Sequence, residues 1–140
     1  MSEQDNILME PIPAYVQMPE TLTLVSSGMI DSRYLDVLKK ISSVKDEIIS
    51  SWLNINVKTF RNYKKSSLEL SPDIQEHTVM LLSLMKHGLD VFGSKESFSQ
   101  WLESENASLN GSSPSDYLNT VSGIKFIDDR LSGMEYGDNA

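Results

Sequence analysis

One segment limits the possible folds of this chain more than any other, and it covers residues 71–92. Ser71 and Pro72 form the cap-then-proline pair that commonly begins a helix, and Gly93 follows as a natural end. Between them the apolar positions recur at a helical period: Ile74, Thr78, Leu81, Leu82, Met85, Leu89 and Phe92, widened by Val79, Leu84 and Val91. A stripe this broad predicts a helix buried on more than one side, with other helices around it. Because no stretch shows a strand pattern of comparable strength, we predict an all-α fold.

Capping residues and apolar periodicity predict further helices on both sides of this segment. They are a helix over residues 30–42, a second capped by Ser43, a third capped by Asn56, a short one capped by Ser94, and a last one capped by Thr120. We therefore expect a helical region before residue 71 and a small helical domain after it.

The first 28 residues have a different character. Pro11, Pro13 and Pro19 interrupt them, and their apolar residues are only weakly periodic. We predict a weakly structured N-terminal arm over residues 1–28, with a short element near residues 22–25.

The charge of the chain is unevenly distributed. The net charge of −8 comes from −4 in residues 1–28, +4 in residues 29–65, and −8 in residues 66–140. Phosphate contacts depend on local basic charge, so the acidic total does not exclude nucleic acid as a partner of the basic region.

The basic region holds two predicted helices joined by the short turn in "WLNINVKTF". The second helix carries Lys58, Thr59, Arg61, Asn62, Lys64 and Lys65, most of them facing away from Val57 and Phe60. Arg can recognise guanine and Asn adenine in the major groove, so this layout favours a helix-turn-helix that binds DNA through these six residues. A solvated helix in a small bundle gives the same layout, and layout alone does not separate the two interpretations.

Enzyme chemistry finds little support in the sequence. There is no cysteine, no Gly-rich phosphate loop, and no nucleophile elbow around Ser112, Ser113 and Ser115. His77 and His87 are ten residues apart on one helix, so they cannot bind a metal together as an i, i+4 pair would. His77, near Asp73 and Glu76, is typical of a surface helix, and the Asp128-Asp129 pair is expected on the solvated face of the last helix. We predict no catalytic residue, no metal and no cofactor.

No apolar run approaches the roughly 20 residues of a membrane helix, and no secretion signal is evident. We therefore expect a cytoplasmic protein without a membrane partner.

Residues 88–137 resemble a known family. They read "GLDVFGSKESFSQWLESENASLNGSSPSDYLNTVSGIKFIDDRLSGMEYG". An apolar-V-F-G run, a short helix with "WL", then N-x-x-L-x-G-x-x-P-x-D-x-L, T-x-x-G and a closing L-x-x-M-E-Y-G occur in order. This series is similar to the toxin-binding domain of the Xre/MbcA/ParS antitoxins, in which a helix-turn-helix-like region comes first. Residues 44–65 stand in that place, so the resemblance extends over roughly residues 30–137.

The resemblance implies an antitoxin of a type II toxin–antitoxin system. Its partner would be a RES-domain toxin that consumes NAD or transfers ADP-ribose from it. Such antitoxins are usually dimers, form higher complexes with the toxin, and repress their own operon by binding operator DNA. The residues implied in toxin binding are Asn110, Gly111, Ser112 and Ser113 in the G-x-x-P loop, and Met134, Glu135, Tyr136 and Gly137 at the end of the domain.

These considerations divide the chain into an arm (1–28), an Xre-like DNA-binding region (29–70), and a toxin-binding domain (71–140) that begins with the long helix over residues 71–92. Electrostatics is consistent with the role, because a toxin that binds NAD needs an electropositive cleft and the last part of the chain is acidic. The alternative is a stand-alone helix-turn-helix transcription regulator whose C-terminal domain dimerises or senses a ligand.

Residues 106–120, "NASLNGSSPSDYLNT", have the Gly, Ser and Pro content of a flexible linker. Within the family pattern we instead predict an ordered connector. Leu109 would pack inward, Gly111 would permit a tight turn, and Ser113-Pro114 would begin a short helix with Asp116 at its third position.

Overall fold

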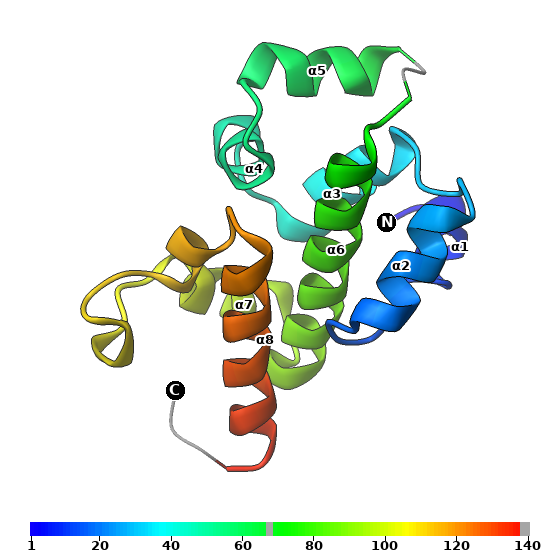
Figure 1. Ribbon diagram of the computed structural model, residues 1–140. Helices are drawn as coiled ribbons and strands as arrows, with labels where there is room; N and C mark the ends of the chain where they lie inside the picture. The colour runs from blue at the N-terminus through cyan, green and yellow to red at the C-terminus, as the bar shows by residue number, and fades with distance from the viewer. Residues whose placement is uncertain (67–68, 138–140) are drawn as a thin grey trace.

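The computed structural model describes residues 1–66 and 69–137, and over these ranges the chain is all-α (Figure 1). The long helix α6 (Pro72–Phe92) lies at the centre, and α2, α3, α4, α7 and α8 all contact it. Val79, Leu81 and Leu84, from different sides of α6, have no exposed surface. The predicted all-α class and the burial of this helix on several sides are confirmed.

The basic region of residues 29–65 forms three helices: α3 (Arg33–Ser42), α4 (Asp46–Leu53) and α5 (Val57–Lys65). The Asn56 side chain accepts a hydrogen bond from the Thr59 amide at 2.8 Å, so the predicted cap of α5 is confirmed. The predicted cap at Ser43 is wrong. Ser43 ends α3 in the left-handed conformation (φ 56°), and α4 begins after Lys45. Val44, in the turn between them, is buried, which explains why the chain needs these residues before the next helix.

Residues 1–28 are not a weakly structured arm, and that prediction is wrong. They form α1 (Glu3–Met9) and α2 (Met18–Ser26), and Ser2 and Asp5 cap α1 reciprocally with two bonds of 3.1 Å. Apolar side chains of this region join the main core: Met9, Ile12 and Leu24. The prolines fall where they disturb no helix, since two lie between α1 and α2 and Pro19 lies in the first turn of α2.

The last part of the described chain contains α7 (Lys95–Glu103), the 3-10 turns η1 (Ala107–Leu109) and η2 (Pro114–Tyr117), and α8 (Val121–Glu135). Ser94 caps α7 and Thr120 caps α8, as predicted, with bonds of 3.1 and 2.9 Å to the Ser97 and Gly123 amides. None of the helices in the described ranges is long and apolar enough to span a membrane.

Candidate functional site

The connector between α7 and η2 is tightly folded. The Asn106 carbonyl accepts the amides of Leu109 (2.9 Å) and Gly111 (3.1 Å), and the Asn106 amide donates to the Ser112 carbonyl (3.0 Å). Asn110 and Gly111 both adopt positive φ, at 56° and 83°, which closes the turn. The connector is therefore an Asn-anchored loop that exposes Asn110 and Gly111 to solvent.

Residues 113–118, which follow this loop, are fixed by a hydrogen bond and by burial of apolar side chains. The Asp116 carboxylate accepts the Ser113 amide at 3.0 Å, while Leu109, Pro114 and Leu118 are buried. The predictions for Leu109, Gly111, the Ser113-Pro114 start and Asp116 are confirmed. The connector is an ordered part of the domain.

The T-x-x-G landmark has a steric explanation. Gly123 lies in the first turn of α8, directly against the Tyr117 carbonyl of η2. A Cβ at this position would fall well inside van der Waals distance of that backbone oxygen. Only glycine lets α8 begin this close to η2, and Thr120 fixes the same turn through its cap.

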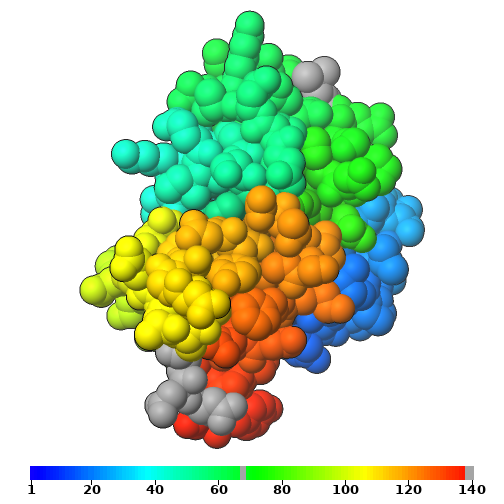
Figure 2. Space-filling model, turned by 60° about the vertical axis from the view of Figure 1, so that its left-hand side comes forward, coloured from blue at the N-terminus to red at the C-terminus, as the bar shows by residue number. Residues whose placement is uncertain are grey.

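At the other end of α8 the predicted toxin-binding residues become progressively exposed. Met134 is half-buried, whereas 88% of Tyr136 is exposed to solvent. Gly137 adopts φ 91°, and its amide donates to the Met134 carbonyl at 3.2 Å. In the space-filling view, the connector and α8 are exposed on the same side of the molecule (Figure 2).

Sequence reasoning missed two residues that link the connector to α8. The Arg130 guanidinium bonds to the Ser108 hydroxyl and lies 5.7 Å from the centre of the Phe126 ring. Phe126 packs on Tyr117 at 5.4 Å between ring centres and is 42% exposed. An exposed aromatic ring stacked with an arginine is the composition found at binding hot spots. Its sequence signal was the i, i+4 spacing of Phe126 and Arg130 on the polar side of α8.

The predicted DNA-binding residues lie on α5, which is joined to α4 by the turn of residues 54–56. Lys58, Arg61, Asn62 and Lys65 are exposed, and Thr59 is half-buried. Lys64 is half-buried and its ammonium lies 5.3 Å from the centre of the Phe60 ring. The helix thus presents a basic outer face, with Asn54 in the left-handed conformation in the preceding turn.

Arg61 differs from its neighbours because it is engaged within the protein. It bonds to Asp46 at 3.0 Å and to Glu47 at 3.2 Å, both in the first turn of α4. The Arg61 hydrogen bond, with support from Lys39, holds the pKa of Asp46 below its ordinary value. Arg61 therefore braces α5 against α4, and Lys58, Asn62 and Lys65 are the side chains presented outward.

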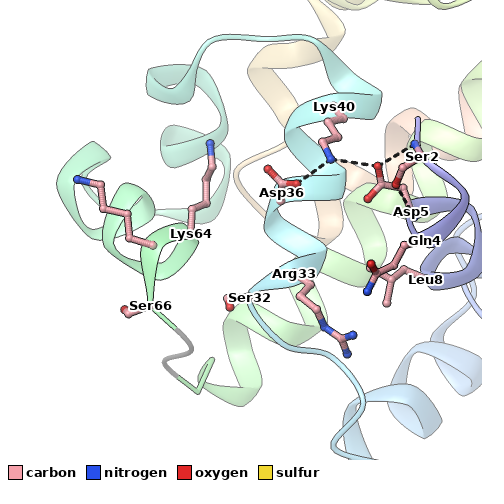
Figure 3. A pocket seen from close by; sticks show the side chains of 11 residues that line it. Ser2, Gln4, Asp5, Leu8, Ser32, Arg33, Asp36, Lys40, Lys64 and Ser66 are labelled. Atoms are coloured by element: carbon pink, nitrogen blue, oxygen red, sulfur yellow. Dashed lines mark hydrogen bonds and ion pairs between the residues drawn. The ribbon is translucent and has the colours of Figure 1, made fainter.

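A cavity of about 440 Å³ adjoins the C-terminal end of α5 and is bordered by α1 and α3 (Figure 3). Lys40 in its wall bonds to both Asp5 and Asp36 at 3.0 Å, so its charge is balanced by α1 and α3. Lys64 faces the cavity from the opposite side (Figure 3). Lys40 is thus neutralised within the fold, whereas Lys65 of the basic face of α5 borders the same cavity.

Two side chains form hydrogen bonds from the α4–α5 unit to the connector region. The Trp52 indole N–H lies 3.2 Å from both the carbonyl and the hydroxyl of Ser115, and the Asn54 side chain donates to the Asn119 carbonyl at 2.8 Å. Burial, reinforced by the nearby charge of Asp116, raises the pKa of Glu103 beside this junction. The two candidate surfaces are therefore parts of a continuous packed structure.

Both histidines are buried, contrary to the expectation of a surface position for His77. Its Nε2 lies 2.9 Å from the Leu118 carbonyl, and burial lowers the pKa of His77. Asp128 is also buried rather than solvated, and its Oδ1 lies 2.7 Å from His87 Nδ1. Within the described residues no group of three His, Asp or Glu side chains is arranged to hold a metal ion.

An ordered helical domain with an exposed loop, an Arg-stacked aromatic ring and a projecting tyrosine has the features of a protein-binding module. Residues 87–137 match the family described as the antitoxin Xre/MbcA/ParS C-terminal toxin-binding domain. The match confirms the resemblance over this segment, so residues 87–137 are similar to the toxin-binding domain of the Xre/MbcA/ParS antitoxins. No curated protein matches the chain.

Proposed function

We propose that this protein neutralises a RES-domain toxin that consumes NAD or transfers ADP-ribose, and that together with the toxin it represses its own operon. The observation that carries the proposal is the match of residues 87–137 to a toxin-binding domain. The surface that would meet the toxin comprises residues 110–113, the end of α8 at residues 134–137, and the Phe126–Arg130 pair between them.

The assignment of a RES-type toxin is supported by charge. Residues 66–140 carry a net charge of −8, and an enzyme that binds the phosphates of NAD needs a positive cleft. Opposite charge accelerates association and disfavours wrong partners, which suits an inhibitor that must find its toxin quickly.

The DNA-binding half of the proposal rests on α5. A helix with Lys58, Asn62 and Lys65 on its outer face can contact phosphates and base edges in a major groove. A homodimer would place two such helices on the half-sites of a palindromic operator.

Co-expression with the protein encoded by the adjacent reading frame tests the proposal. The expected result is rescue of growth and co-purification of the two proteins. A matched variant, Phe126→Ser with Arg130→Ser, should weaken both, while Lys125→Ser on the solvent side of the same helix should not. Absence of rescue and of co-purification would contradict the antitoxin role. DNA binding without toxin binding would favour the stand-alone regulator.

A further inference from the structure

His87 lies where three segments of the chain meet. Its ring is buried on α6, Nδ1 is 2.7 Å from Asp128 Oδ1, and Nε2 contacts the carboxylate of Glu135. Asp128 and Glu135 are both on α8, two turns apart. The Tyr15 ring, from the segment between α1 and α2, meets the imidazole edge-on at 6.2 Å between ring centres.

The number of hydrogen-bond acceptors around His87 indicates the protonation state of its imidazole. A neutral imidazole has one N–H and can donate to only one carboxylate, whereas the imidazolium donates from both nitrogens. Asp128 is held in place by a second bond, because its Oδ2 accepts the Val16 amide at 3.2 Å. Lys86, the adjacent residue, is turned toward the N-terminal segment and donates to the carbonyls of Met9 (2.7 Å) and Ile12 (2.6 Å).

The groups that face His87 thus comprise Asp128 and Glu135 from α8 and Tyr15 from the α1–α2 segment. Burial alone would lower the pKa of His87, but hydrogen bonds and charge attraction from Asp128 and Glu135 outweigh it and raise the pKa. The two carboxylates favour the doubly protonated ring, in agreement with the geometry.

Glu135 links the contacts of His87 to the proposed toxin-binding residues at the end of α8. It is the last residue of α8, and a carboxylate at a helix C-terminus is repelled by the helix dipole. A buried cation in contact with Glu135 offsets that repulsion. Glu135 also belongs to residues 134–137, from which Tyr136 projects into solvent.

We propose that His87, protonated on both nitrogens, is a positioning residue that fixes the last turn of α8 and so holds residues 134–137 in the orientation that meets the toxin. The part of this inference that concerns the toxin, here called the toxin clause, rests on the proposed function. The fixed last turn of α8 is a property of the isolated protein. The N-terminal segment takes part through Val16, which sets the orientation of Asp128.

The first test uses the isolated full-length chain. Amide hydrogen exchange over residues 131–135 should be about tenfold faster in Glu135→Gln and in His87→Gln than in the wild type, since a charge-assisted bond is lost. Asp129→Asn is the matched control, because it removes an exposed carboxylate from the same helix, and its exchange should equal that of the wild type. Nitrogen NMR at pH 6 should show two protonated ring nitrogens in His87.

The second test measures affinity for the adjacent-frame protein between pH 6 and 9. Wild type and Asp129→Asn should lose affinity in parallel as pH rises, and His87→Gln should be about tenfold weaker at pH 6 with a flatter profile. If His87→Gln does not fold, Glu135→Gln serves for the exchange measurement.

Equal exchange in Glu135→Gln and Asp129→Asn, or a singly protonated His87 at pH 6, would overturn the proposal while leaving the antitoxin role intact. A wild-type protein with the expected exchange pattern but no affinity for the adjacent-frame protein would instead overturn the proposed function and the toxin clause with it.

Discussion

Several single residues in this protein make steric or electrostatic contacts that no neighbouring residue could make. Gly123 admits the Tyr117 carbonyl at the start of α8, and Gly88 admits the Phe98 ring against α6. His87 holds two carboxylates of α8. Each of these contacts joins two different elements of the fold, so a single side chain or its absence decides how closely the two elements can approach.

Gly123→Ala is expected to destabilise the fold by about 3 kcal/mol, the upper part of the range for overpacking, because the obstructing atom belongs to the backbone. Urea denaturation monitored by circular dichroism measures the change. Ser122→Ala, at the exposed neighbouring position, should leave the free energy of unfolding within about 0.5 kcal/mol of the wild type. Equal stability of the two variants would show that η2 does not approach α8 as described.

The two histidines should give stability opposite dependences on pH. The raised pKa of His87 means that its contribution is complete below about pH 6.5, the unfolded value, and is lost as pH rises through the folded pKa. Burial lowers the pKa of His77, so its protonation in the unfolded state costs stability as pH falls below about 6.5.

Urea titrations of wild type, His87→Gln and His77→Gln between pH 5.5 and 9 check this dependence. The stability advantage of wild type over His87→Gln should shrink with rising pH, and that of wild type over His77→Gln should shrink with falling pH. Differences independent of pH would contradict both assignments.

At the scale of elements, most of the predicted caps and the connector agree with the structure because they depend on nearby residues. Asn56, Ser94 and Thr120 each bond to an amide three positions further on. Helix α1 was missed, and α2 was expected only as a short element near residues 22–25, because both helices are short and gain stability by packing on the rest of the protein. Prolines there mark helix boundaries, and weak periodicity concealed Met9 and Leu24 as core residues.

Leu24→Ala should destabilise the protein by about 2–3 kcal/mol if α2 is docked, since its side chain is 9% exposed and lies in the core. Leu22→Ala is the matched control on the same helix, where the side chain is 51% exposed, and it should change stability by less than about 0.5 kcal/mol. Thermal unfolding compares the two, and similar midpoints for both variants would restore the interpretation of residues 1–28 as an arm.

At the scale of the whole molecule, the basic face of α5 and the acidic toxin-binding domain belong to one packed body. Trp52 and Asn54 bond from the α4–α5 unit to the segment between η2 and α8. Lys86 and Asp128 bind the N-terminal segment to the C-terminal half. The proposed DNA-binding and toxin-binding surfaces are therefore separate but share one core.

Separate surfaces predict separable defects. Lys58→Ala with Lys65→Ala should weaken operator binding and lower the salt slope of log K by about 1 to 2, because up to two phosphate contacts are lost. Co-purification with the toxin should be unchanged. Gel shifts at several salt concentrations measure the slope, and Lys125→Ala, which removes a lysine charge from α8 instead of α5, is the control. An unaltered slope would remove α5 from the DNA interface.

The sequence by itself determined the helical class, the central helix, most caps, the ordered connector and the family of residues 87–137, because periodicity, capping and motif order are properties of neighbouring residues. Tertiary structure decided what depends on contacts between distant residues. Asp128 lies on the apolar side of α8, one turn from Ile124 and Leu131. Only the tertiary structure shows that its carboxylate bonds there to the His87 ring and the Val16 amide. Arg61, likewise, is basic in sequence but is bound by Asp46 and Glu47 in the fold. A charge is free or neutralised according to its neighbours in space, which no local pattern specifies.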